Sequence, residues 1–214
     1  LAPFRNAIQI MKLAGTTGDV AERAREMAER QVQALTRMVD DLLVLANAEQ
    51  PRFIEPQATD LATFTQGLLE RAGALGDRGW QIDAAADGVV LADEQRLVQA
   101  SLNLLRNAVE HTDPGTEVGI GTALTGDRLA IWVRDAGPGI DPADQERLFE
   151  RFARASGGRR RTEGAGLGLA IVRAIAEAHG GTVSVDSTLG HGARFTIEVP
   201  VEIPVARTPP WPES

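Results

Sequence analysis

The stretch Asp135–Ile140, which reads DAGPGI, is the motif around which the rest of this 214-residue chain is organised. It follows the apolar segment Leu129–Val133, which predicts a strand, and it places one carboxylate on a turn with two glycines. Because glycine has no Cβ, such a turn can adopt positive φ angles or approach a flat molecule closely. The carboxylate of Asp135 can accept a hydrogen bond from an exocyclic amine, such as that of adenine. An ordinary exit from a strand is the competing interpretation of the turn alone.

The composition excludes several classes of function. With a net charge of −8, the chain lacks the basic surface that non-specific binding to nucleic acid requires, so we expect no nucleic-acid partner. The absence of cysteine rules out disulfides and thiolate metal sites. Lys12 is the only lysine, so neither a Walker-type nucleotide site nor the strand lysine of a eukaryotic-type protein kinase is possible.

The hydropathy pattern contains no membrane-targeting signal. No apolar run reaches the roughly 18 residues that a membrane-spanning helix needs, and no signal-peptide pattern is found. We therefore expect a cytoplasmic chain with no membrane contact of its own. Any membrane anchor would belong to an upstream region of a longer protein.

Residues 1–50 predict a helical hairpin. Apolar residues line one face of Leu1–Ala14, and a longer helix is expected over Val20–Ala48, where the apolar spacing alternates between four and three. The apolar stripe of this second helix is wider than one partner helix covers, so we expect two hairpins to pair as a dimeric four-helix bundle. The alternative is a monomer in which the hairpin packs against its own second domain.

Beyond residue 50 the pattern changes from helical to mixed. Pro51 and Pro56 place a linker at residues 51–59. Asp60 and Asp93 predict helix starts. The other expected elements are strands at 80–82 and 89–91, a hairpin of 117–123 with 128–134, a helix from 141 to about 152, a helix over 167–179 and a hairpin of 182–186 with 193–199. Together they predict an α+β fold, in which an α/β sandwich with helices on one face of a mixed sheet occupies residues 60–203. The proline-rich tail, 204–214, is expected to be disordered.

Two asparagines mark the helix that is expected after Asp93. Asn103 and Asn107 are four residues apart, which places both amides on one helical face. An amide oxygen can ligate Mg²⁺, which prefers oxygen ligands shared with nucleotide phosphates. The alternative is that both amides only satisfy neighbouring backbone groups.

A glycine-rich motif, Gly164–Leu169, joins an expected mobile loop at 153–165 to the helix that follows. Amides at such a helix N-terminus point at a phosphate in many proteins. The motif is not the Rossmann fingerprint, because its third glycine comes one residue early and no strand precedes it. A further motif, Gly190–Phe195, is expected to form a turn that shapes the floor of a pocket.

These four motifs, in this order and spacing, closely resemble the ATP-binding domain of bacterial sensor histidine kinases, a Bergerat-type fold shared with gyrase, the mismatch-repair ATPases and the large heat-shock chaperone. The resemblance covers about 60–201 and implies ATP and Mg²⁺ as cofactors. It also implies that Asn107 binds the metal and that Arg154, after a segment similar to the phenylalanine box (Phe149–Phe152), reaches the γ-phosphate. The residues that it assigns to ATP are Asn103, Asn107, His111, Asp135, Gly137, Gly139, Ile140, Arg154, Gly164, Gly166, Leu167 and Gly168.

The hairpin resembles the dimerisation and phosphotransfer domain of these kinases, which implies a homodimer and a response regulator receiver domain as partners. The family's acceptor histidine lies in a His-Glu-Leu-Arg-x-Pro stretch just upstream of the segment that matches Leu1, so this chain lacks it. We expect His111 near adenine, and His179 at a helix C-terminus where the dipole favours it. Neither these two nor His191 is placed to accept phosphate.

Phosphotransfer to histidine is the preferred interpretation. The hydrolysing relatives carry a glutamate where this chain has Asn103, and an amide cannot act as the general base for water. Glu110 stands where the family commonly has lysine, so a dimeric regulatory pseudokinase or adaptor that does not transfer phosphate is one alternative. A serine kinase of the anti-sigma-factor type is another.

Overall fold

The computed structural model describes residues 18–48, 50, 52–152 and 166–204. The chain divides into two compact units, Leu1–Ala46 and Asn47–Ser214, which are described separately. The expected helix Leu1–Ala14, the expected loop 153–165 and residues 205–214 of the expected tail lie outside the described residues. No helix in the described part of the chain is both long enough and apolar enough to span a membrane.

In the first unit the described residues form one long helix, α2 (Gly18–Asn47), close to the range that the sequence predicts. Most of its large apolar side chains are exposed, Val39 by 55% and Val32 by 51%, whereas Val44 and Leu45 near its end are buried. The other exposed apolar residues of α2 are Met27, Leu35, Met38, Leu42 and Leu43. A helix with so much apolar surface is typical of one that packs against partner helices.

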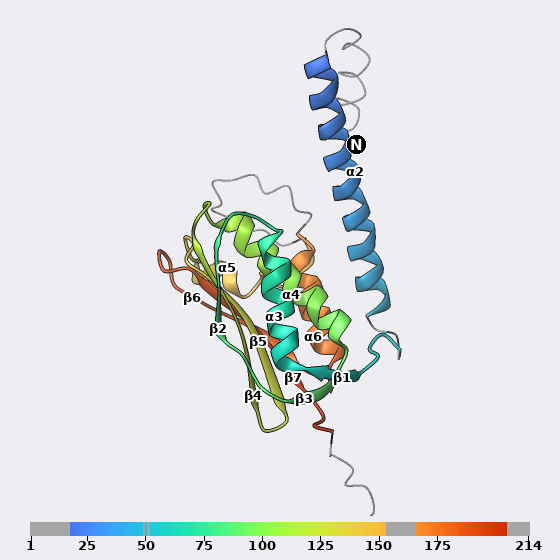
Figure 1. Cartoon of the computed structure of the whole chain (residues 1–214), viewed down its shortest axis with the longest axis vertical. Coiled ribbons are helices and arrows are strands. Elements are labelled where there is room, and N and C mark those ends of the chain that lie inside the picture. Colours follow the sequence, from blue (N-terminus) through green and yellow to red (C-terminus); the bar gives the residue numbers. More distant parts are fainter. Residues whose placement is uncertain (1–17, 49, 51, 153–165, 205–214) are drawn as a thin grey trace, which may run out of the picture. The chain divides into compact units, whose positions relative to one another are not determined.

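The second unit is a two-layer α+β sandwich, as predicted (Figure 1). Its five-stranded sheet has the order β2-β4-β5-β7-β6, and only β2 with β4 is a parallel pair. Helices α3, α4 and α6 cover one face of this sheet. The bounds are α3 Leu61–Gly73, β2 Gly79–Ala84, α4 Glu94–His111, β4 Glu117–Thr125, β5 Arg128–Asp135, α6 Gly168–Ala178, β6 Thr182–Ser187 and β7 Ala193–Pro200.

The core of the second unit is formed by the strand side chains that point to the helix-covered face of the sheet. Alternate residues of β5, such as Leu129 and Ile131, are buried completely beneath the helices. Phe195 and Ile197 of β7 continue the same layer, and Leu104 of α4, the helix that packs on β5, is also fully buried. Each large side chain that is removed from water in this way contributes about 1.5–3 kcal/mol to the stability of the fold.

The opposite face of the sheet carries a polar network around one tryptophan. The indole Nε1 of Trp132 donates to Asp83 Oδ2 at 3.1 Å, and the Arg194 guanidinium carbon lies 4.2 Å from the centre of its ring. Arg134 also donates to Asp83, at 2.9 Å, and mainly through this bond the pKa of that carboxyl is held below its usual range. A Cβ at Gly121 would lie 2.1 Å from the Trp132 ring, so the ring occupies space that the glycine leaves. Trp132 is only 7% exposed as a result.

A small second sheet was not predicted. Strand β1 (Gln57–Asp60) pairs antiparallel with β3 (Val89–Ala92), so part of the expected linker is a strand. The sequence of β1 lacks an apolar alternation, since Thr59 alone among its four residues is buried. Pairing with β3, rather than local propensity, determines this strand.

The helix that was expected from 141 to about 152 is much shorter, and that prediction was wrong. Helix α5 (Pro142–Gln145) has four residues. The amides of Arg147 and Glu150 then bond to carbonyls three residues back, at 3.1 and 3.0 Å, which is the pattern of successive turns. Phe152 ends this segment with a φ of 63°, and its N–H donates to Gly166 O.

Candidate functional site

Helix α4, which carries the two asparagines, is held firmly at its start. Asp93 is the N-cap, and its Oδ1 accepts from the Arg96 amide at 3.0 Å. The other carboxylate oxygen accepts from the Glu55 amide at 2.9 Å. The Arg96 guanidinium carbon lies 4.3 Å from the centre of the Phe53 ring. The segment before β1 is thereby attached to the beginning of α4.

Asn103 lies in the buried part of α4 and is only 9% exposed. Its amide oxygen, Oδ1, accepts from Arg106 Nη1 at 3.1 Å, so the amide nitrogen, Nδ2, is the atom left to donate. This Nδ2 is buried and has no hydrogen-bond partner among the described residues. A buried donor without a partner costs about 1–3 kcal/mol. The amide therefore fits an acceptor such as a phosphate oxygen, and Asn107, one turn further on and half-buried, offers an amide oxygen of the type that Mg²⁺ binds.

Helix α6 begins directly beside Asn103. A Cβ at Gly168, the first residue of α6, would lie 3.9 Å from Asn103 Cβ. The N-cap residue, Leu167, makes no side-chain hydrogen bond to the helix. The first amides of a helix have no partner within it, so this N-terminus can bind an anion. Gly166, with φ of 70°, sets the direction in which the chain enters α6.

Asp135, the last residue of β5, is a buried carboxylate with 6% exposure. Its Oδ1 accepts from the Gly137 amide at 2.8 Å. Burial raises the pKa of Asp135, and this effect outweighs the opposite effects of its hydrogen bonds from backbone amides and of its electrostatic interactions with His111 and Arg134. A carboxylate in this position can accept a further hydrogen bond from a ligand amine.

The turn after Asp135 is shaped by neighbouring protein segments. A Cβ at Gly139, where φ is 72°, would lie 2.2 Å from Thr188 O in the β6–β7 turn. The Gly190 amide donates to Pro138 O at 2.7 Å, and the Ile140 amide donates to Ser187 Oγ at 2.9 Å. Gly139 is therefore required by the protein itself, independently of the approach of a ligand that the sequence suggested. Of the expected turn Gly190–Phe195, residues 190–192 lie between the strands, whereas Ala193–Phe195 already belong to β7. Its role as the floor of a pocket stays a prediction.

The described residues among the predicted site residues lie towards the end of the sandwich where α4 and β5 end and α6 begins (Figure 1). Asn103 contacts the start of α6, and a Cβ at Gly137 would lie 3.0 Å from the carbonyl oxygen of His111. His111 is the exposed last residue of α4. Two predicted residues, Arg154 and Gly164, lie outside the described residues. No group of three or more His, Cys, Asp or Glu residues able to hold a metal occurs in the described part of the chain.

His179 ends α6, as predicted, but its environment does not favour a charged imidazole. Burial lowers the pKa of His179. The ring Nδ1 lies 2.8 Å from Ile175 O, and Nε2 is buried without a partner among the described residues. A neutral imidazole that donates to the Ile175 carbonyl fits this geometry better than a cation that complements the helix dipole.

Sequence reasoning missed Arg78, which bonds to the end of α4. The residue is a single arginine between α3 and β2, and no motif surrounds it. Its importance depends on contacts with residues more than 30 positions away. Local sequence contains no signal for such contacts.

The comparison with protein families agrees with this geometry. The model of the family described as histidine kinase-, DNA gyrase B-, and HSP90-like ATPase matches residues 92–203, more than half of the chain. The matched range starts just before α4 and ends just after β7. It therefore contains every described residue of the candidate site.

Individual relatives are sensor histidine kinases. The chain is 35% identical over 205 residues to the probable sensor histidine kinase TcrY of Mycobacterium tuberculosis, a match that covers 94% of this chain and 43% of TcrY. The structure of full-length ShkA in complex with AMPPNP has a TM-score of 0.72 and 30% identity, over 95% of this chain and 43% of ShkA. The mycobacterial sensor histidine kinase MprB has a TM-score of 0.61 and 30% identity, over 69% of this chain and 100% of that structure.

The chain spans about half or less of the length of the curated relatives that it matches. The family model, these relatives and the fold of the second unit agree with one another. The chain belongs to the family of histidine kinase-, DNA gyrase B- and HSP90-like ATPases, and within it contains the catalytic core of a bacterial sensor histidine kinase.

Proposed function

We propose that this chain binds Mg-ATP at the end of the sandwich where α4 and β5 end and α6 begins, and transfers the γ-phosphate to a histidine for relay to a response regulator. The observation that carries the proposal is the pairing of Asn103 with the start of α6. A buried amide donor without a described partner lies beside a helix N-terminus without a side-chain cap. Both features suit the negatively charged oxygens of a phosphate chain.

Each predicted residue has a role in this proposal. The carboxylate of Asp135 accepts a hydrogen bond from the adenine amine, with His111 beside the base. Asn107 holds Mg²⁺, which when bound would neutralise charge on the phosphate oxygens. Asn103 and the amides of Gly166–Gly168 contact the phosphates. Further contacts are assigned to Gly137, Gly139 and Ile140 around the base, and to Arg154 and Gly164, which lie outside the described residues.

The choice between transfer and hydrolysis rests on Asn103. An amide cannot remove a proton from water, so hydrolysis lacks the factor of about 10²–10⁴ that a general base contributes. An imidazole nitrogen needs no such base to attack phosphorus. The nitrogen–phosphorus bond then forms as the bond from the γ-phosphorus to the β–γ bridging oxygen breaks, and ADP leaves with that electron pair. The chain's own residues contribute positioning and electrostatic stabilisation.

The same proposal includes the assembly. Residues 1–50 would form the dimerisation and phosphotransfer hairpin, 51–59 the linker, 60–203 the ATP-binding domain and 204–214 a disordered tail. The exposed apolar side chains of α2, among them Val32, Leu35 and Val39, support a homodimer through a four-helix bundle. A response regulator receiver domain would accept the phosphoryl group from the phosphohistidine.

The test is transfer of label from γ-labelled Mg-ATP to a separate hairpin fragment that carries a His-Glu-Leu-Arg-x-Pro segment. We expect label that is stable in base and lost in acid, as phosphohistidine is. Asp135→Asn is the control, because an amide presents a donor as well as an acceptor and should abolish adenine selection. Acid-stable label would indicate a serine kinase instead. ATP binding without transfer to any tested acceptor would favour a regulatory pseudokinase.

A further inference from the structure

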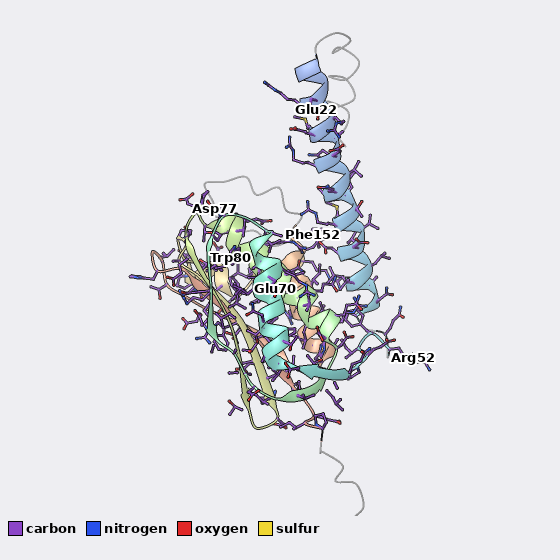
Figure 2. All side chains as sticks on the ribbon, viewed as in Figure 1. Glu22, Arg52, Glu70, Asp77, Trp80 and Phe152 are labelled. Carbon is purple, nitrogen blue, oxygen red and sulfur yellow. The ribbon has the colours of Figure 1, made fainter. Side chains whose placement is uncertain are left out.

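Arg78, in the loop between α3 and β2, closes the end of α4 with three hydrogen bonds. Its Nε donates to Thr112 Oγ1 at 2.7 Å, and its Nη2 donates to Val109 O at 2.8 Å and to Thr112 O at 2.9 Å. The remaining nitrogen, Nη1, donates to Asp77 O at 2.6 Å. Figure 2 labels Asp77 and Trp80, close neighbours of Arg78 in the sequence, at the end of the sandwich where α4 ends.

These bonds satisfy carbonyls that a helix leaves without partners at its C-terminus. Thr112, the C-cap residue of α4, is buried, and its hydroxyl donates to Ala108 O at 2.6 Å. The guanidinium of Arg78 satisfies the next carbonyl, Val109 O, and brings a positive charge to the negative end of the helix dipole. The planar fork makes several bonds at once, which an ammonium group cannot reproduce.

The loop that carries Arg78 is itself fixed in place. The Gly115 amide donates to Asp77 O at 3.0 Å, and the Gly79 amide donates to Thr116 O at 2.9 Å. Both residues next to Arg78 are therefore bonded to the segment that leaves α4. With its backbone held on both sides, Arg78 gives up only the rotamer freedom of its side chain when it makes these contacts.

The end of α4 is in turn packed against the turn that carries Asp135. A Cβ at Gly137 would lie 3.0 Å from His111 O and 3.3 Å from Thr112 Cγ2, so these two residues determine where Gly137 can lie. The Gly137 amide donates to Asp135 Oδ1. A shift at the end of α4 would consequently move the group that orients the Asp135 carboxylate.

We propose that Arg78 is the positioning residue for adenine selection: it holds His111 and Thr112 against Gly137, and through Gly137 it orients the carboxylate of Asp135. The inference rests on the proposed function of this site. Arg78 contacts no predicted phosphate-binding residue in any of its hydrogen bonds. Its loss should therefore affect recognition of the base and leave binding of the phosphates unchanged.

The test measures the dissociation constants of Mg-ATP, Mg-GTP and Mg-tripolyphosphate by calorimetry for the full chain. For Arg78→Ala we expect the constant for ATP to rise about tenfold, which corresponds to the loss of one charge-assisted hydrogen bond. The constants for GTP and tripolyphosphate should change less than about twofold, within the scatter of near-neutral substitutions. Arg78→Lys should lie between the parent and Arg78→Ala. It retains the charge and loses the fork.

Arg71→Ala is the matched control, because Arg71 is an exposed arginine of α3 whose side chain, among the described residues, donates only to Gly67 O of its own helix, at 2.8 Å. It should bind all three ligands as the parent does. A lower melting temperature in Arg78→Ala with an unchanged ratio of GTP to ATP constants would overturn the proposal, and so would an equal loss of ATP and tripolyphosphate. If Arg78→Ala does not fold, the ratio of the GTP to the ATP dissociation constant in Arg78→Lys tests the proposal in its place. A parent chain that binds no Mg-ATP would instead refute the proposed function, and with it this inference.

Discussion

Helices α4 and α6 pack against each other but begin in opposite ways. The start of α4 is closed by the buried Asp93, which accepts from two backbone amides. The start of α6 has Leu167 as its N-cap, without a side-chain hydrogen bond, and lies beside Asn103 Nδ2, which has no partner among the residues that the structure describes. Asp60 caps α3 in the same manner as Asp93 caps α4.

The difference indicates how stability and ligand binding are divided within one layer of helices. Where a carboxylate satisfies the first amides, the helix end contributes to folding. Where no side chain does so, the amides and the dipole remain available to an anion. Substitutions at the two helix starts should therefore act on different measurements, namely the free energy of unfolding for α4 and ligand affinity for α6.

Asp93→Ala should weaken the start of α4 most severely. It leaves two amides without a buried acceptor, and we expect the free energy of unfolding to fall by about 3 kcal/mol. Asp60→Ala is the control, since Asp60 is exposed and accepts from the Thr63 amide at 2.8 Å. It should cost about 1 kcal/mol. Urea unfolding measures both values, and equal losses would show that burial of Asp93 adds nothing.

Asn103→Leu should separate stability from ligand binding at the start of α6. Removing a buried donor that has no partner in the described part of the chain should leave the free energy of unfolding unchanged or raise it by about 1 kcal/mol. The dissociation constant of Mg-ATP should rise about tenfold or more. Gln99→Leu makes a comparable polar-to-apolar change one turn earlier in α4, where Gln99 accepts from Arg96, and should leave ATP binding unchanged. If the two variants bind ATP equally, Asn103 does not contact the ligand.

Gly168→Ala should show whether the glycine serves the fold or the ligand. The added Cβ would make ordinary contacts, 3.9 Å from Asn103 Cβ, and φ is not positive. Helix propensity then raises the free energy of unfolding by about 0.5–1 kcal/mol. The methyl group should raise the dissociation constant of Mg-ATP about fivefold, because it crowds the first amides.

Gly73→Ala provides the control for this substitution, because a Cβ at the end of α3 would meet nothing within 4 Å. It should gain stability without losing ATP affinity. An unchanged ATP affinity in Gly168→Ala would mean that no ligand approaches the first turn of α6 closely.

The pH dependence of binding should be the smallest effect. Burial raises the pKa of Asp135, so its carboxylate is protonated, and loses its role as an acceptor, at a higher pH than an ordinary aspartate. ATP affinity should fall as pH falls through this raised pKa, and Asp135→Asn should not show that dependence. The same titration with Mg-tripolyphosphate corrects for protonation of the phosphates. An identical pH dependence for both ligands would contradict the role of Asp135.

The same shift has a consequence for stability, with its sign fixed by linkage. Because the folded pKa of Asp135 lies above the unfolded value, the carboxyl contributes stability below the unfolded pKa and loses that contribution as pH rises through the folded pKa. The buried charge thus costs stability at neutral pH. Asp135→Asn should be no less stable than the parent there, as thermal melting can show.

Much of the fold could be predicted because its signals are local. Asp60 and Asp93 identify helix starts through a bond to an amide three residues away. The β4–β5 hairpin follows from apolar patterns on both sides of Gly126, whose φ of 59° suits the turn. The described residues of the motifs fall at one end of the sandwich because β5 ends and α6 begins there.

The features that sequence reasoning missed depend on distant partners. Strand β1 exists through its pairing with β3, about 30 residues away, and the early end of α5 depends on turns that no periodicity shows. Arg78 is the clearest case, since three of its four hydrogen bonds cross more than 30 residues. A lone arginine in a loop resembles any solvated charge until the end of α4 is placed beside it.

The packing of Trp132 over Gly121 has a consequence for the evolution of the sheet. Any side chain at position 121 would collide with the indole ring, so the two positions should change together across relatives. We expect larger residues at position 121 only where position 132 carries a smaller one. In this chain, Gly121→Ala should lower the free energy of unfolding far less in combination with Trp132→Val than it does alone. Such a pair is an example of epistasis whose cause is the volume of a single ring.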